Sequence, residues 1–179
     1  MTRVFLGLGA NIGNRAANLR MALRWLEGPC TVTAVSSLYR SEAAVLEGQP
    51  PGPDFFNAAC EIETDLSPAD PLRFLKEVEQ AIGRRPAARW APRPIDIDIL
   101  LYGDRVVHTP TLDIPHPLLV ERNFVLLPLA ELASDVEHPA LHRTIGDLAE
   151  EADFTGLQHL SGPEWATGED EVEPDDALT

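Results

Sequence analysis

Lysine, cysteine and aromatic residues are scarce in this chain, and none of its apolar runs is long. Lysine provides one of the 14 basic residues, cysteine two of the 179 residues, and aromatic side chains 6%. Cys30 and Cys60 are too few for a disulfide framework or a zinc site, so we interpret both as small buried residues. No apolar run approaches the about 20 residues of a membrane-spanning helix, and the N-terminus lacks the layout of a signal peptide. We therefore expect a cytoplasmic protein without a membrane partner.

Basic residues are absent after Arg143. Residues 1–143 carry 18 acidic residues against all 14 basic ones, whereas residues 144–179 carry 11 acidic residues and no basic one. The net charge of −15 is therefore concentrated toward the C-terminus, and the body of the protein is nearly neutral. We expect one domain over residues 1–160, an acidic and disordered tail over residues 161–179, no nucleic-acid partner, and a monomer.

Two common nucleotide-binding motifs are missing. No Gly-Lys-Ser or Gly-Lys-Thr occurs, which excludes a P-loop. Gly7, Gly9 and Gly13 resemble a dinucleotide fingerprint, but Ile12 occupies the position of its third glycine. These glycines either form a tight turn that needs positive φ or let the backbone approach a ligand.

Hydrophobic periodicity predicts the element order β-α-β-β-α-β. The expected strands are residues 3–8, 31–39, 55–64 and 95–101. The first helix buries Leu19, Ala22, Leu23 and Leu26 and ends at Gly28-Pro29; the second begins with Ser67 as N-cap and Pro68 at the first helical position, buries Leu72, Leu75, Val78 and Ile82, and ends at Gly83. This order is typical of an α+β, ferredoxin-like core with an antiparallel sheet and both helices on one face.

The residues after the fourth strand are expected to cover the opposite face of the sheet. Gly103-Asp104 predicts a hairpin turn that returns through Val106-Val107. The apolar residues after Pro115 include a predicted helix over residues 124–132, interrupted at Pro128, and a short helix near residues 144–152. These helices would extend the core to a three-layer αβα sandwich.

A cationic stretch precedes the fourth strand. Four arginines lie within ten residues: Arg84, Arg85, Arg89 and Arg93. They surround Trp90, and three prolines keep the stretch from forming a regular helix. Asp96 and Asp98 then lie on one face of the strand. A cationic loop beside paired carboxylates indicates a polyphosphate with its magnesium ion, although an Asp-x-Asp pair alone is more often a solvated strand face.

Three other polar residues and one loop are candidates for the same site. Glu79 lies in the last turn of the second helix, where a carboxylate is disfavoured, so we expect a nearby arginine as its partner. Asn57 is either a satisfied core amide or a ligand-facing group that donates and accepts at once. His116, between two prolines, is either structural or a phosphate contact. The Gly- and Pro-rich loop 41–53 is either a mobile segment near a ligand or disorder without function.

Six segments resemble the 6-hydroxymethyl-7,8-dihydropterin pyrophosphokinase family of folate biosynthesis. They are Phe5–Gly13, Ser36–Arg40, Phe55–Ala59, Glu79–Arg84, Arg89–Leu101 and Pro115–Phe124. The segments cover about residues 3–138 in order. The pattern Arg-Trp-x-Pro-Arg-x-Ile-Asp-Ile-Asp, which begins at Arg89, is highly specific to that family.

The resemblance implies an ATP-dependent pyrophosphokinase. Such an enzyme transfers a whole pyrophosphoryl group from ATP to the hydroxymethyl oxygen of the pterin and releases AMP. The implied fold is a ferredoxin-like αβα core, and the implied partners are the small molecules ATP and 6-hydroxymethyl-7,8-dihydropterin. Asp96 and Asp98 would hold two Mg²⁺ ions that bridge the triphosphate.

The same resemblance implies a set of site residues. The catalytic residues would be Arg84, Arg89, Arg93, Asp96 and Asp98. The ATP-binding residues would be Glu79, Arg84, Arg89, Trp90, Arg93, Ile99, His116 and Arg122. The pterin-binding residues would be Ser41, Ala44, Phe55, Asn57, Trp90, Asp96 and Phe124, with the pterin between the two phenylalanines and Asn57 on its polar edge.

Four features depart from the family pattern. Ala91 replaces a usual glycine and would stiffen the hinge of the loop. The loop is one residue short around Pro86-Ala87-Ala88, which removes one phosphate contact unless Arg85 replaces it. Ser41-Glu42 stands where Thr-Pro is common, and Phe55 replaces a common tyrosine.

Two rival functions remain compatible with the sequence. One is a non-catalytic ferredoxin-like module that binds ATP or a pterin, in which Asp96→Ala would leave the physiological output intact. The other is a partner-binding role led by the acidic tail, with catalysis secondary. Deletion of residues 162–179 without any change in catalysis or complexes would exclude the second.

Overall fold

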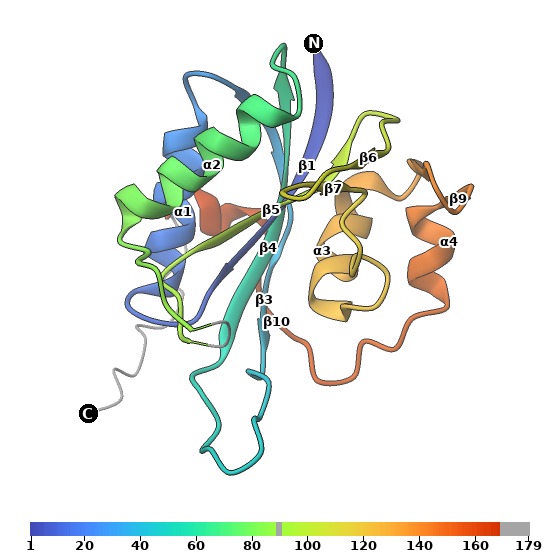
Figure 1. The fold of residues 1–179 in the computed structure, drawn as a ribbon. Coiled ribbons are helices and arrows are strands. Elements are labelled where there is room, and N and C mark those ends of the chain that lie inside the picture. Colours follow the sequence, from blue (N-terminus) through green and yellow to red (C-terminus); the bar gives the residue numbers. More distant parts are fainter. Residues whose placement is uncertain (89–90, 169–179) are drawn as a thin grey trace.

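One antiparallel sheet of six strands organises residues 1–88 and 91–168, which are the residues that this computed structural model describes (Figure 1). Its strands run in the order β10-β3-β4-β1-β5, and β2 also pairs with β4. The strands are β1 (Thr2–Ala10), β2 (Thr31–Val35), β3 (Leu38–Ser41), β4 (Phe55–Thr64), β5 (Asp96–Tyr102) and β10 (Gln158–Ser161). The first strand of the chain therefore lies inside the sheet, between β4 and β5.

The predicted single strand over residues 31–39 is wrong, because the chain forms two strands there. The break falls at Ser36 and Ser37, between β2 and β3. The Ser36 hydroxyl accepts a hydrogen bond from the Ala59 N–H at 2.8 Å, and it donates to the Ser37 carbonyl at 2.8 Å. A side chain thus takes the place of a backbone acceptor in the ladder, which interrupts the regular pairing.

Two long helices cover one face of the sheet. They are α1 (Arg15–Leu26) and α2 (Ala69–Ile82), and both lie on the same side in Figure 1. All four predicted stripe residues of α1 are buried. The predicted cap of α2 is wrong by one position: the N-cap is Pro68, since the Ser67 hydroxyl bonds the Asp70 carboxylate at 3.1 Å instead of a backbone N–H. Gly83, at φ 121°, ends α2 as predicted.

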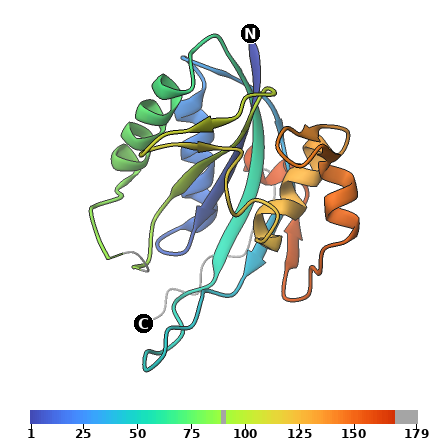
Figure 2. The ribbon, with the colours of Figure 1, turned by 45° about the vertical axis from the view of Figure 1, so that its right-hand side comes forward.

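The opposite face is covered by α3 (Asn123–Ala133) and α4 (Ile145–Glu150), as Figure 2 shows. These helices pack against Phe5, Leu100 and Leu101 in a second core cluster. The predicted interruption at Pro128 is wrong, because α3 continues through this residue. Pro128 is buried with its neighbours Leu126 and Leu129, and this packing offsets the backbone hydrogen bond that a proline cannot make.

The predicted hairpin after β5 is also corrected. The chain turns at Gly103, but β6 (Val107–His108) pairs with β7 (Asp113–Ile114) and not with β5. The outer edge of β5 is occupied further along the chain, because the His116 N–H donates to the Leu100 carbonyl at 3.0 Å. The short β6–β7 hairpin therefore delivers His116 to the edge of β5.

The C-terminal part of the described chain belongs to the fold. After the small hairpin of β8 (Glu137–His138) and β9 (Arg143–Thr144), β10 pairs with β3, and the 3₁₀ helix η1 (Pro163–Ala166) follows. Trp165 in η1 is 0% exposed, and its Nε1 donates to the Ser36 carbonyl at 2.8 Å. The expected disorder over residues 161–179 is therefore wrong for residues 161–168, because a buried indole anchors them. Residues 169–179 lie outside the described residues.

The two cysteines agree with the expectation from composition. Cys30 and Cys60 are buried and free, as predicted, and burial raises the pKa of Cys60 to about 12. None of the helices in the described parts of the chain has the length and apolarity needed to cross a bilayer.

Candidate active site

Two glycines of β1 form a low floor on the α3 side of the sheet. Gly9 is paired with Asn57 of β4 and with Asp96 of β5, and Gly7 is paired with Asp98. Their neighbours along β1 point into the core under α1 and α2, so the glycine positions face the other way. A Cβ atom on Gly9 would lie 3.7 Å from the Asn57 side-chain oxygen and 3.8 Å from the Phe55 ring.

The alternative of a tight turn applies to only one of the three glycines. Gly13 has φ +70°, whereas Gly7 and Gly9 are regular strand residues. At Gly9 the missing side chain leaves space beside Asn57 and Phe55 of β4, next to Asp96 of β5. At Gly7 the Leu100 side chain lies close instead, 3.3 Å from where a Cβ atom would be. This arrangement favours the second alternative, in which the backbone lets a ligand approach closely.

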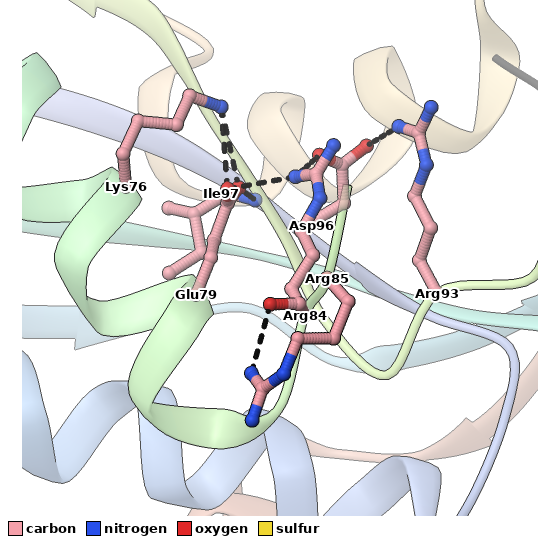
Figure 3. A network of polar contacts seen from close by, with 7 residues as sticks. All are labelled: Lys76, Glu79, Arg84, Arg85, Arg93, Asp96 and Ile97. Atoms are coloured by element: carbon pink, nitrogen blue, oxygen red, sulfur yellow. Dashed lines mark hydrogen bonds and ion pairs between the residues drawn. The ribbon is translucent and has the colours of Figure 1, made fainter. Parts of the chain in front are cut away.

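Asp96, at the start of β5, is held by two arginines (Figure 3). Arg84 Nη1 donates to Asp96 Oδ1 at 2.7 Å, and Arg93 Nη1 donates to Asp96 Oδ2 at 3.2 Å. The Asp96 side chain is 24% exposed, so the cluster is reachable from solvent. The two arginines and the carboxylate thus form a compact charged group at the beginning of the strand.

Glu79 connects this group to α2. Its carboxylate is 2% exposed and accepts the Ile97 N–H at 2.8 Å, and Arg84 Nη1 lies 2.7 Å from its Oε2. Burial raises the pKa of Glu79, while the Ile97 N–H, Lys76 and Arg84 act in the opposite direction. The prediction of an arginine partner for Glu79 is confirmed.

A pocket opens beside Asp98 at the edge of β5. Its volume is about 280 Å³, and Lys76, Asp98, Ile99 and His116 are among its lining residues. Burial and the neighbouring Asp96 raise the pKa of Asp98. Burial lowers the pKa of His116, although Asp98 opposes this effect. The structure therefore brings Asp98, Ile99 and His116 together, with apolar walls such as Leu72 and Leu112 around them.

The predicted pterin-binding residues lie mostly on the glycine-floored face. The Asn57 side-chain amide donates to the Ser41 hydroxyl at 2.8 Å, and both residues are buried. Phe124, near the start of α3, lies beside Arg122, whose guanidinium carbon is 5.7 Å from the ring centroid. Ala44 is exposed in the loop between β3 and β4, and this loop extends beyond the sheet in Figure 2.

The remaining residues of the arginine loop considered for the site are Arg85, Arg89 and Trp90. Arg85 donates to the backbone carbonyls of Gln80 and Arg84, at 3.2 and 3.1 Å. Figure 3 shows its guanidinium turned away from Asp96, so in this conformation it does not replace a missing phosphate contact. Arg89 and Trp90, both predicted site residues, lie outside the described residues.

Two residues of the site escaped the reasoning from sequence. Asn11 holds the loop before β5, because its Oδ1 accepts the Arg93 N–H at 2.6 Å and its own N–H donates to the Arg93 carbonyl at 3.0 Å. Its signal was an asparagine among glycines. Lys76 lines the pocket and lies 3.3 Å from Glu79. Its signal was its status as the one lysine in an arginine-rich chain.

The donor set at β5 fits a divalent cation whose remaining ligands come from a substrate. Asp96 and Asp98 lie two positions apart on one strand face, and their repulsion contributes to the raised pKa of Asp98. Across residues 1–88 and 91–168, no group of three or more His, Cys, Asp or Glu side chains could hold a metal alone. Two carboxylates with phosphate oxygens and water suit Mg²⁺, which usually binds few protein ligands.

Comparison with known proteins tests the family resemblance. The family described as 7,8-dihydro-6-hydroxymethylpterin-pyrophosphokinase (HPPK) matches residues 5–134. The 2-amino-4-hydroxy-6-hydroxymethyldihydropteridine pyrophosphokinase of Aquifex aeolicus is 38% identical over 151 residues, which cover 84% of this chain and 92% of that protein. Its Bacillus subtilis counterpart is 41% identical over 138 residues, which cover 76% of this chain and 81% of that protein.

Other similar proteins are longer than this chain. The folic acid synthesis protein FOL1 of Dictyostelium discoideum is 41% identical over 141 residues, but the match spans only 21% of its length. The crystal structure of wild-type Plasmodium falciparum HPPK-DHPS superposes with a TM-score of 0.68 at 17% identity, covering 84% of this chain and 44% of that chain. At this identity the structural likeness concerns the fold alone. The resemblance predicted from the motifs is confirmed, and this chain belongs to the 7,8-dihydro-6-hydroxymethylpterin-pyrophosphokinase family.

Proposed function

We propose that this protein transfers the pyrophosphoryl group of ATP to the hydroxymethyl oxygen of 6-hydroxymethyl-7,8-dihydropterin and releases AMP. The observation that carries the proposal is the cluster of Asp96, Arg84 and Arg93 beside the glycine floor that leads to Asn57. Family membership supports the same reaction. Phosphoryl transfer depends on positioning and charge neutralisation more than on covalent chemistry, and these side chains supply both.

The nucleotide is placed in the pocket beside β5. Its lining includes the apolar residues Leu72, Ile99 and Leu112, which suit a purine base, and the polar residues Asp98 and His116. From there the triphosphate would extend along the face of β5 toward Asp96. His116 and Arg122 are assigned to its phosphates, as the family resemblance implies.

The arginines change partners in this proposal. Without nucleotide, Arg84 and Arg93 neutralise Asp96. Asp96 and Asp98 would hold Mg²⁺, two ions being expected. The guanidinium groups of Arg84 and Arg93 would then be available to phosphate oxygens, which they match in geometry and charge. The bound metal supplies charge neutralisation of the triphosphate. Arg89 and Trp90 are assigned to the same phosphate-covering loop from the sequence.

The pterin is placed over Gly9. Phe55 borders this floor, and Phe124 lies on the α3 side with Arg122. The Asn57 amide, oriented by Ser41, offers a donor and an acceptor to the heterocycle edge. A substrate between these groups would have its hydroxymethyl group directed to the carboxylates of β5, where the phosphates are expected.

We also infer a ferredoxin-like core within a three-layer αβα sandwich. The sheet order β4-β1-β5 and the placement of α1 and α2 opposite α3 and α4 support this architecture (Figures 1 and 2). The pyrophosphokinase domain would then extend past the expected boundary at residue 160, because Trp165 completes the core. A monomeric state and a cytoplasmic location stay predictions from the sequence.

Phosphorus NMR tests the reaction directly. Protein, ATP, Mg²⁺ and the hydroxymethyl-dihydropterin should yield AMP and the pterin diphosphate. Asp96→Ala should abolish most of this turnover, whereas Asp104→Ala, an exposed acidic residue in the turn after β5, should retain it. ADP as the product would refute pyrophosphoryl transfer, and ATP binding without any turnover would favour the rival binding module.

A further inference from the structure

Lys76 lies where the nucleotide pocket meets the buried carboxylate of Glu79. It belongs to α2, lines the pocket with Asp98 and His116, and is 48% exposed. Its Nζ lies 3.3 and 3.5 Å from the two carboxylate oxygens of Glu79. No other lysine occurs in the chain, and none of the catalytic assignments made above uses it.

Glu79 has two cationic neighbours that approach from different directions. Figure 3 shows Lys76 reaching it from α2 and Arg84 reaching it from the loop before β5. Arg84 Nη1 is 2.7 Å from Glu79 and also 2.7 Å from Asp96, so this one group bridges both carboxylates. If the Arg84 guanidinium turns so that Nη1 meets a phosphate, it leaves Glu79, which is 2% exposed.

A buried carboxylate that loses its cation is unfavourable, because little water is present to solvate the charge. The Ile97 N–H would continue to donate to Glu79 at 2.8 Å, but it carries no net charge. Among the residues that the structure describes, Lys76 is then the remaining positive side chain at Glu79, and its attraction already opposes the effect of burial on the pKa of Glu79.

We propose that Lys76 is a positioning residue that keeps Glu79 paired while Arg84 turns from Glu79 and Asp96 to the phosphates of the bound nucleotide. Lys76 thereby lowers the free-energy cost of moving Arg84 from the two carboxylates to the nucleotide phosphates. This inference rests on the proposed function, because it requires nucleotide phosphates near Arg84. It differs from a direct contact between Lys76 and the nucleotide, which would not depend on Glu79.

A double-mutant cycle distinguishes these two roles. Binding of Mg²⁺ and α,β-methylene-ATP, in which the bond to be broken is unreactive, is measured by calorimetry for the wild type, Lys76→Met, Glu79→Gln and the double variant. Lys76→Met should weaken binding about tenfold. In the Glu79→Gln background, the same change should alter binding less than about twofold, because a neutral amide needs no counter-ion.

Matched variants control for general effects. Arg73→Met removes an exposed cation one turn earlier on α2 and should leave affinity unchanged. Lys76→Arg keeps the charge and should retain affinity within about threefold. Melting curves confirm that each variant is folded.

The outcomes separate the inference from the proposed function. If the wild type fails to bind the analogue, the proposed function is overturned, and this inference with it. If the wild type binds but Lys76→Met does not weaken binding, Lys76 has no positioning role. An equal loss in both backgrounds would assign Lys76 to direct contact and would also overturn the proposal.

Discussion

Replacement of Trp165 by alanine is expected to lower the free energy of unfolding by about 3–5 kcal/mol, the usual range for a buried tryptophan. The indole is 0% exposed in the core cluster that includes α1, and its Nε1 donates to the Ser36 carbonyl at 2.8 Å. Trp165→Phe retains much of the apolar contact and mainly loses this hydrogen bond, which should account for about 1–3 kcal/mol. The alanine variant should therefore be clearly less stable than the phenylalanine variant.

Urea denaturation followed by circular dichroism measures these differences. For a protein of this size, each kcal/mol corresponds to about 2–4 °C, so Trp165→Ala should also melt roughly 6–20 °C lower. Trp25 provides a matched control on α1, because it is 51% exposed. Trp25→Ala should remain within about 0.5 kcal/mol of the wild type.

Equal stability of Trp165→Ala and Trp25→Ala would contradict this expectation. Such a result would mean that the indole contributes nothing to the cooperative unit, although the structure buries it fully. A loss for Trp165→Phe equal to that for Trp165→Ala would instead show that the hydrogen bond to Ser36 outweighs the apolar contact.

Three further predictions concern the floor, the carboxylate pair and a remote histidine. Gly9→Val should raise the pterin KM about tenfold or more by filling the space beside Asn57, while Gly9→Ala should have a much smaller effect; steady-state kinetics at saturating ATP would contradict this if both variants matched the wild type. Asp98→Asn should lower activity about 100-fold or more. It should also raise the melting temperature without ligand, because the raised pKa of Asp98 means that its charge destabilises the fold. A lower melting temperature would contradict this destabilising effect of the charge. Burial lowers the pKa of His138 from 6.5, so its neutral form contributes stability above pH 6.5 that is lost as the pH falls through the lowered pKa. His138→Gln should therefore show a flatter fall in unfolding free energy below pH 6.5, and equal slopes in acid denaturation would count against the assignment.

The regular parts of the fold could be predicted because their signals are local. The apolar stripe of α1, the glycine after α2 and the alternation of β5 each follow from a few neighbouring residues. The wrong predictions concern segments whose conformation depends on contacts with residues far away in the sequence. Pro128 remains inside α3 because it is buried together with its apolar neighbours. Trp165 is held by the hydrogen bond from its Nε1 to the Ser36 carbonyl. Neither partner can be read from the adjacent sequence.

The candidate site could also be predicted from the sequence only in part. The unfavourable position of Glu79 at a helix C-terminus pointed to an arginine, and Arg84 is that partner. The common face of Asp96 and Asp98 followed from strand geometry. Lys76 was missed because its relevance depends on the pocket formed with the segment around His116, far along the chain. Arg85 could not be distinguished from its neighbour by charge alone, yet it binds the end of α2.

The position of η1 has a consequence for the order of folding. Trp165 closes a core whose other walls are built from α1 and the first strands, and its contact with Ser36 spans 129 residues of sequence. During synthesis α1 and the first strands would leave the ribosome with this apolar surface uncovered, since the covering residue is made long after them. Contacts of such long range slow folding and prolong exposure to aggregation. Completion of the core, and with it a stable β3 beside Asn57, would therefore wait until η1 has been made.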